Sequence, residues 1–114
     1  MDLVFDLEPG DVRLFVDEST EQIEAIEGGL LELERGDAPA ATVNEVFRAA
    51  HTLKGSAAAI GHRRMAELTH AMEDIFGALR SGSISDAAPF ADTLLATIDV
   101  LRALVERTAP RLRA

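Results

Sequence analysis

The sequence predicts an all-α protein folded as an antiparallel up-down-up-down four-helix bundle. Apolar residues recur at the three- and four-residue spacing of one helix face in four successive stretches, which short Gly-, Pro- and Ser-containing segments separate. The composition agrees, because Ala, Leu and Glu are abundant, aromatic residues make up 4% of the chain, and Tyr and Trp are absent. Helices of similar length joined by short connections favour antiparallel packing in one bundle.

The length of 114 residues fits one domain with a single hydrophobic core. We therefore expect residues 1–114 to form one unit. Within it the periodicity predicts helices at about 11–34, 42–60, 62–80 and 86–107.

The first predicted helix carries one apolar stripe and is followed by Gly36, a residue type that commonly ends helices. Gly28 and Gly29 interrupt it, and the sequence leaves open whether they mark a close packing point or a slight bend. The stripe consists of Val12, Phe15, Ser19, Gln22, Ile23, Ile26, Leu30 and Leu33.

The second predicted helix opens at Thr42, because Thr42 and Glu45 have the spacing of a capping box. In that motif the hydroxyl and the carboxylate bind backbone N–H groups that have no helical partner. The helix is expected to end near Gly61. Its stripe consists of Val43, Val46, Ala50, Leu53, Ala57 and Ile60, with Phe47 at the edge.

The third helix is predicted to follow almost at once and to end at Ser81 and Gly82, with Arg80 placed to interact with the helix dipole. The fourth is predicted to start near Asp86, with Pro89 tolerated in its first turn. The apolar positions of these two helices complete the core: Met65, Leu68, Met72, Ile75, Phe76 and Leu79 in the third, and Ala87, Phe90, Ala91, Leu94, Ile98, Leu101 and Val105 in the fourth.

Charge and composition exclude several functional classes. The net charge of −9 argues against nucleic acid as a partner, since phosphate binding requires Lys and Arg. Cysteine is absent, so neither a disulfide framework nor a thiolate metal site is expected. No apolar run approaches the roughly 20 residues of a membrane span, and the acidic start does not resemble a signal peptide. We expect a cytoplasmic protein that binds neither nucleic acid nor membrane.

The segment around His51 contains residues that packing of a helix does not explain. Helical geometry places His51 on the face opposite the core stripe, with Lys54 one turn further on and with Gly55 and His62 on the same face, within about 40° of His51. Glycine costs about 1 kcal/mol relative to Ala in a helix interior, so Gly55 suggests that space is needed next to His51. Ser56 lies about 140° around the helix from His51, which predicts a structural hydrogen bond to the backbone or another helix.

Two polar residues of the third predicted helix should reach the level of His51. His70 lies opposite that helix's apolar stripe, and Glu73 shares its side. Because His51 precedes the turn at Gly61 by about as many residues as His70 and Glu73 follow it, antiparallel packing brings all three to similar heights. With Lys54 they should converge on one rim between the two helices.

This constellation suits phosphoryl chemistry. A carboxylate that accepts a hydrogen bond from Nδ1–H of His51 fixes the tautomer and leaves Nε2 nucleophilic, and Glu73 is the candidate for that role. Lys54 would offset the charge of a phosphoryl group, Gly55 would leave room for it, and His70 would be a further hydrogen-bond donor.

Two alternatives stay open at this point. A metal-binding bundle could use His51, His70 and Glu73, together with His62. Its weaknesses are the outward direction of these groups and the added positive charge of Lys54. The other alternative is a structural docking bundle without chemistry, in which His51 is an ordinary surface residue.

The same residues resemble a known family. Residues 47–56, Phe-Arg-Ala-Ala-His-Thr-Leu-Lys-Gly-Ser, followed by Gly61, are similar to the phosphorylation motif of histidine-containing phosphotransfer (HPt) domains. Residues 66–74, Ala-Glu-Leu-Thr-His-Ala-Met-Glu-Asp, resemble the next helix of the version at the N-terminus of chemotaxis-type (CheA-type) histidine kinases. The resemblance covers nearly the whole chain, with one departure at Ala57-Ala58-Ala59, where members often have a glycine soon after the serine.

The resemblance implies that His51 is the phospho-accepting residue, Glu73 its hydrogen-bond partner, and Lys54 and His70 accessory polar groups. It implies a domain that is not catalytic alone and binds no cofactor of its own. A histidine kinase catalytic domain would phosphorylate His51 from ATP and Mg²⁺. The group would then pass to an aspartate of a CheY-like response regulator, which would hold its own Mg²⁺.

Overall fold

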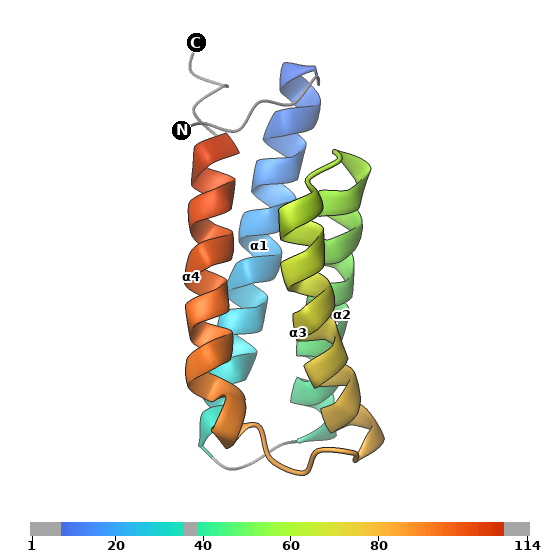
Figure 1. Cartoon of the computed structure of the whole chain (residues 1–114), viewed down its shortest axis with the longest axis vertical. Helices are drawn as coiled ribbons and strands as arrows, with labels where there is room; N and C mark the ends of the chain where they lie inside the picture. Colours follow the sequence, from blue (N-terminus) through green and yellow to red (C-terminus); the bar gives the residue numbers. More distant parts are fainter. Residues whose placement is uncertain (1–7, 36–38, 109–114) are drawn as a thin grey trace.

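A computed structural model describes residues 8–35 and 39–108. Along these residues the chain forms four long helices and one short 3-10 helix. The helices pack side by side in alternating directions, so that the α2–α3 turn lies at the same end of the bundle as the start of α1 and the end of α4 (Figure 1). The predicted all-α four-helix bundle is thus confirmed. The elements are α1 (Pro9–Glu34), α2 (Ala40–Ala59), α3 (Arg63–Ser81), η1 (Ala88–Phe90) and α4 (Ala91–Thr108).

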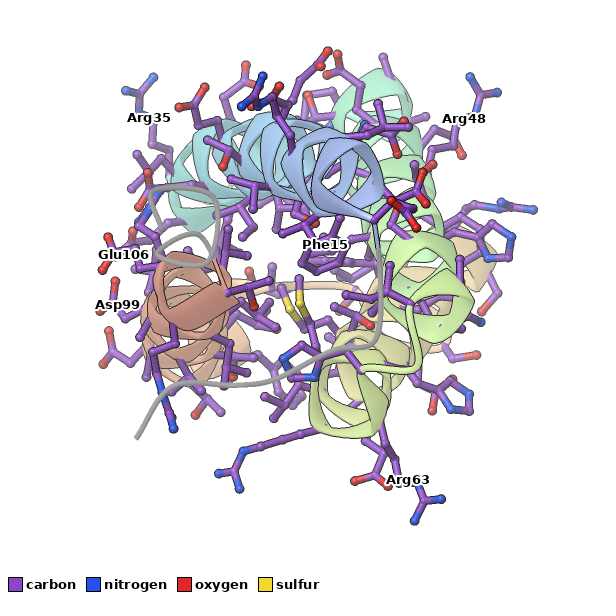
Figure 2. All side chains as sticks on the ribbon, turned by 90° about the horizontal axis from the view of Figure 1, so that it is seen from above. Phe15, Arg35, Arg48, Arg63, Asp99 and Glu106 are labelled. Carbon is purple, nitrogen blue, oxygen red and sulfur yellow. The ribbon has the colours of Figure 1, made fainter. Side chains whose placement is uncertain are left out.

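The core fills the space between the four helices. Figure 2 shows Phe15 directed into this space, whereas Arg48 and Arg63 point outward. Removing a side chain of this kind from water contributes about 1.5–3 kcal/mol, so the apolar stripes supply most of the driving force for assembly. The largest fully buried side chains include Ile23, Ile26, Leu30, Leu33, Val46, Leu53, Met65, Met72, Phe76, Leu94, Ile98 and Leu101.

The first helix begins two residues earlier than predicted. Pro9 occupies the first helical turn, where the missing N–H of proline costs nothing, and the backbone N–H of Asp11 bonds the carbonyl of Glu8 at 3.0 Å. The helix ends at Glu34 as predicted. Gly36, expected to stop it, lies outside the described residues.

The capping box predicted at Thr42 is wrong. The second helix begins at Ala40 after Pro39, which caps it without a side-chain hydrogen bond. Two alanines extend the helix back to the proline, so Thr42 is the third residue of the helix and is buried. Its hydroxyl instead donates to Glu32 of α1 at 3.3 Å. Thr42 therefore joins two helices, and the start of α2 is set by Pro39.

Gly29 is a close packing point between α1 and α2, which settles the question that the sequence left open. A Cβ atom added there would overlap Cγ1 of Val46, while a Cβ at Gly28 would meet nothing within 4 Å. The absence of a side chain at Gly29 thus lets the two helices approach closely.

The turn between α2 and α3 has the hydrogen bonds of a Schellman motif. Gly61 adopts a positive φ of 77°, its N–H bonds the carbonyl of Ala58 at 3.1 Å, and the N–H of His62 bonds Ala57 at 2.9 Å. α3 begins at Arg63, one residue later than predicted, because His62 is its N-cap. The Nδ1 atom of His62 accepts from the backbone N–H of Met65 at 3.3 Å.

The fourth helix starts later than the predicted residue 86. Asp86 accepts a hydrogen bond from the N–H of Ala88 at 3.0 Å, and residues 88–90 form a 3-10 turn that contains Pro89. Because proline has no N–H to donate, the α-helical ladder begins only at Ala91. It ends at Thr108, one residue beyond the prediction. Within the described ranges, no helix combines the length and apolarity needed to cross a membrane.

Candidate functional site

His51 lies on the outer face of α2. Ala50 and Leu53 of the same helix are buried in the core, so the helical spacing directs the imidazole of His51 to the opposite side of the helix. Its side chain is 66% exposed. A buried histidine could not be reached by a second macromolecule, whereas this one can.

Glu73 of α3 bridges His51 and Lys54. Its Oε2 atom contacts Nδ1 of His51, and its Oε1 atom accepts a hydrogen bond from Nζ of Lys54 at 2.7 Å. The carboxylate is only 12% exposed, although it belongs to a residue outside the apolar stripe. The three side chains that the sequence placed on one rim therefore do meet across the α2–α3 interface.

The environment of Glu73 favours its ionised form. Burial by itself would raise the pKa of Glu73, but the hydrogen bonds from Lys54 and His51, the positive charge of Lys54 and that of His51 when it is protonated outweigh it, and the pKa lies below its usual value. An ionised carboxylate can only accept hydrogen bonds. Nδ1 of His51 must therefore carry the proton, which leaves the lone pair on Nε2 as the nucleophile of the neutral imidazole.

Gly55 has open space around it. A Cβ atom at this position would meet nothing within 4 Å. Packing inside this chain therefore does not require glycine at this position, one turn beyond His51. The helix-propensity cost of about 1 kcal/mol is not offset by any close contact that the glycine allows within the chain. The clearance remains available to a molecule that approaches the imidazole.

Ser56 forms the interhelix hydrogen bond that its angular position predicted. Its hydroxyl donates to Oε2 of Glu18 on α1 at 3.4 Å. Glu18 was not singled out from the sequence, because a partner on another helix has no local signal. This long contact links α1 to α2.

His70 stands apart from the other three side chains. Its Nε2 atom lies 3.7 Å from the carboxylate of Asp74, one turn further along α3, and its side chain is 62% exposed. Across the described ranges, no hydrogen bond or ion pair joins it to His51, Lys54 or Glu73. His70 and Glu73 lie on the same side of α3, but this did not bring His70 to His51 as predicted, because the three-residue step between them rotates His70 farther from α2.

His62 belongs to the interior. It is 4% exposed, and burial together with the positive charge of Arg107 lowers its pKa, against the opposing effect of a backbone hydrogen bond. Extending the helical angle of α2 to residue 62 had placed it on the His51 face. That extrapolation was wrong because Gly61 ends the helix and turns the chain inward.

The metal-binding alternative finds no ligand set in the part of the chain that the structure describes. No group of three or more His, Asp or Glu side chains there could hold a metal ion. His62 points into the core, and Glu73 is already bound by two cationic or donor groups.

Phe47, Gly77 and Arg80 form a contact that sequence reasoning missed. The guanidinium of Arg80 lies over the ring of Phe47, with its Cζ atom 4.5 Å from the ring centroid. Arg80 had been explained by the helix dipole alone and Phe47 as the edge of a stripe. The glycine in α3 was the available signal, since it costs helix stability without marking a helix end.

An exposed histidine on a four-helix bundle, with Nδ1 held by a partly buried carboxylate from the next helix, defines the histidine phosphotransfer class of domains. Residues 12–108 match the family model of the Hpt domain. The chain belongs to the Hpt domain family.

Curated relatives point to one branch of this family. The chain is 37% identical to the chemotaxis protein CheA of Treponema pallidum over 95 residues, which are 83% of this chain and 12% of that protein. It is also 37% identical to CheA of Bacillus subtilis over 93 residues, 82% of this chain and 14% of the relative. The chain thus spans only a small part of the length of these relatives.

Two solved structures share the fold closely. The CheA phosphotransferase domain from Thermotoga maritima matches with a TM-score of 0.82 and 34% identity, over 89% of this chain and 96% of that one. The phosphorylated P1 domain of CheA3, in complex with CheY6 from R. sphaeroides, matches with a TM-score of 0.83 and 32% identity, over 91% and 81% of the two chains.

Proposed function

We propose that this domain carries a phosphoryl group on His51 between a histidine kinase catalytic domain and a CheY-like response regulator in chemotaxis signalling. The observation that carries the proposal is the bond between Nδ1 of His51 and Glu73. It leaves Nε2 unprotonated on a side chain that is 66% exposed. Membership of the Hpt family and the CheA relatives support the same conclusion.

In the first step Nε2 attacks the γ-phosphorus of ATP held by the kinase domain. A P–N bond forms, the bond from the γ-phosphorus to the β–γ bridging oxygen breaks, and ADP leaves with that electron pair. Nδ1 keeps its proton throughout, so the ring acquires positive charge that the adjacent carboxylate of Glu73 stabilises. Lys54, bound to the same carboxylate, places a cation beside the incoming phosphoryl group.

In the second step an aspartate carboxylate of the regulator attacks the phosphorus. The P–N bond breaks, its electron pair returns to Nε2, and an acyl phosphate forms on the regulator. His51 is restored as the neutral Nδ1–H tautomer, ready for another cycle. Neither step needs a cofactor in this domain, since the kinase domain would bring ATP and Mg²⁺ and the regulator its own Mg²⁺.

The surface near His51 gives a partner room to dock. Gly55, one turn beyond His51, carries no side chain, and a Cβ atom there would meet nothing within 4 Å. A relative whose P1 domain is phosphorylated was solved in complex with CheY6, which supports a regulator as one partner. In this proposal His70 is an accessory donor at the edge of the same surface.

The test is labelling with a CheA-type kinase domain and radioactive ATP. We expect phosphate that is labile in acid and stable in base, and its transfer to a CheY-like regulator. A His51→Gln variant should not be labelled, while a His70→Gln variant, which keeps the His51–Glu73 contact, should be. Equal labelling of the His51→Gln protein would refute the proposal and favour a structural docking role.

A further inference from the structure

The α2–α3 interface repeats itself one helical turn away from the phosphotransfer site. His51 meets Glu73, and Phe47 meets Gly77. Phe47 lies four residues before His51, and Gly77 lies four residues after Glu73. Because the helices are antiparallel, both steps run in the same direction, and the two contacts are one turn, or about 6 Å, apart along the interface.

A second pair of contacts follows the same register. Lys54 binds Glu73, and seven residues away on each helix the Arg80 guanidinium lies over the Phe47 ring. Two turns therefore separate these contacts on both helices. The polar contacts around Glu73 and the aromatic contacts around Phe47 are thus two levels of one helix pairing.

Phe47 is partly buried and lies against two residues of α3. A Cβ atom built on Gly77 would lie 3.3 Å from Cε1 and 3.8 Å from Cδ1 of the ring, so the ring edge occupies space that a side chain at residue 77 would need. The Arg80 guanidinium covers the ring. The absence of a side chain at residue 77 therefore leaves room for the Phe47 ring beside α3 at this level.

We propose that Phe47, seated on Gly77 and covered by Arg80, is a positioning residue that holds α2 and α3 at the spacing at which Glu73 reaches Nδ1 of His51. A side chain at residue 77 would displace Phe47 and with it the neighbouring turn of α2. The hydrogen bond one turn away depends on a donor–acceptor distance that tolerates only a few tenths of an ångström. The inference deepens the proposed function, on which its kinetic consequence rests.

The test is a Gly77→Val variant compared with Gly28→Val. Both changes put the same β-branched residue into a helix, but a Cβ atom at Gly28 meets nothing within 4 Å, whereas one at Gly77 meets Phe47. We expect the Gly77→Val protein to keep its helical circular dichroism, to lose much of the Nδ1–H tautomer of His51 in ¹⁵N NMR at alkaline pH, and to be phosphorylated about tenfold more slowly. The Gly28→Val protein should match the wild type in both site measurements.

A compensating change separates positioning from general damage. In a Phe47→Leu/Gly77→Val double variant the smaller side chain makes room for the valine, so the tautomer population and the labelling rate should recover at least partly. If Gly77→Val unfolds the domain, Gly77→Ala carries the same test with a smaller displacement. A folded variant at residue 77 with a wild-type tautomer population would overturn the inference. The tautomer population is measured without kinase or ATP. It therefore tests the positioning role of Phe47 even if the domain is not labelled and the proposed function fails.

Discussion

Nζ of Lys54 lies 2.7 Å from Oε1 of Glu73, across the interface between α2 and α3. The other carboxylate oxygen contacts Nδ1 of His51. One carboxylate therefore orients the lysine and the histidine together, and losing it should affect both.

Replacing Glu73 with Ala should slow phosphorylation of His51 at least tenfold, because the imidazole loses the partner that fixes its tautomer and balances its developing charge. Glu73→Gln, which keeps a neutral acceptor, should lie between Ala and the wild type. The free energy of unfolding should change by no more than about 1 kcal/mol, since the Glu73 carboxylate lies at the edge of the bundle and outside the apolar core. Asp74→Ala is the control, because Asp74 is 72% exposed and contacts only His70 among the described residues. Equal rates for Glu73→Ala and Asp74→Ala would contradict the assigned role.

Gly55 offers a test in which stability and function should move in opposite directions. Because a Cβ atom there has free space, Gly55→Ala should raise the free energy of unfolding by up to about 1 kcal/mol in a denaturant titration. Gly55→Leu should also fold, yet slow phosphoryl transfer from His51 to the regulator, because its side chain fills the approach to the imidazole. Gly28→Leu is the matched control. A Gly55→Leu protein that transfers phosphate at the wild-type rate would show that the clearance serves no partner.

The two neighbouring glycines of α1 should respond oppositely to alanine. A Cβ atom on Gly29 overlaps Val46, so Gly29→Ala should destabilise the domain by about 1–3 kcal/mol. Gly28→Ala, with open space at the same depth along the helix, should be neutral or stabilising by up to about 1 kcal/mol. Urea unfolding of both variants measures the difference. Similar effects at the two positions would mean that α1 and α2 do not approach each other at Gly29.

Stability should depend on pH through His62. Burial lowers its pKa in the folded state below the ordinary value of about 6.5, so the unfolded chain takes up the proton first as the pH falls. The contribution of the neutral, buried His62 is therefore complete above the unfolded pKa and is lost progressively as the pH drops below it. Protonation would also remove the Nδ1 lone pair that caps α3 at Met65.

The measurement for His62 is the free energy of unfolding by urea on both sides of this pKa. His62→Asn keeps a side-chain acceptor at the N-cap but does not titrate, so its stability should vary less with pH in this range. His70→Gln removes an exposed histidine and should keep the wild-type dependence. A wild-type slope in the His62→Asn protein would assign the effect to other groups.

Much of the site could be predicted because it depends on helical repetition. The spacing of apolar residues in α2 was sufficient to place His51 outside the core, and similar sequence distances from Gly61 were sufficient to bring Glu73 to its level. The same reasoning misplaced His70 and His62. For His70, the height along the bundle does not determine the direction around the axis of α3 in which the side chain points. For His62, the helical angle of α2 no longer applies, because the helix ends before Gly61.

The four helices, their buried faces and the outward direction of His51 follow from the amino-acid sequence, because hydrogen bonding within a helix and apolar periodicity are properties of a continuous segment. Three contacts between helices became evident from the packed fold: Glu73 binds both His51 and Lys54, Thr42 bonds Glu32 and does not cap α2, and Phe47 lies beside Gly77. These contacts join residues from different helices. They depend on how closely and at what rotation two helices pack, which the side chains of both helices set together.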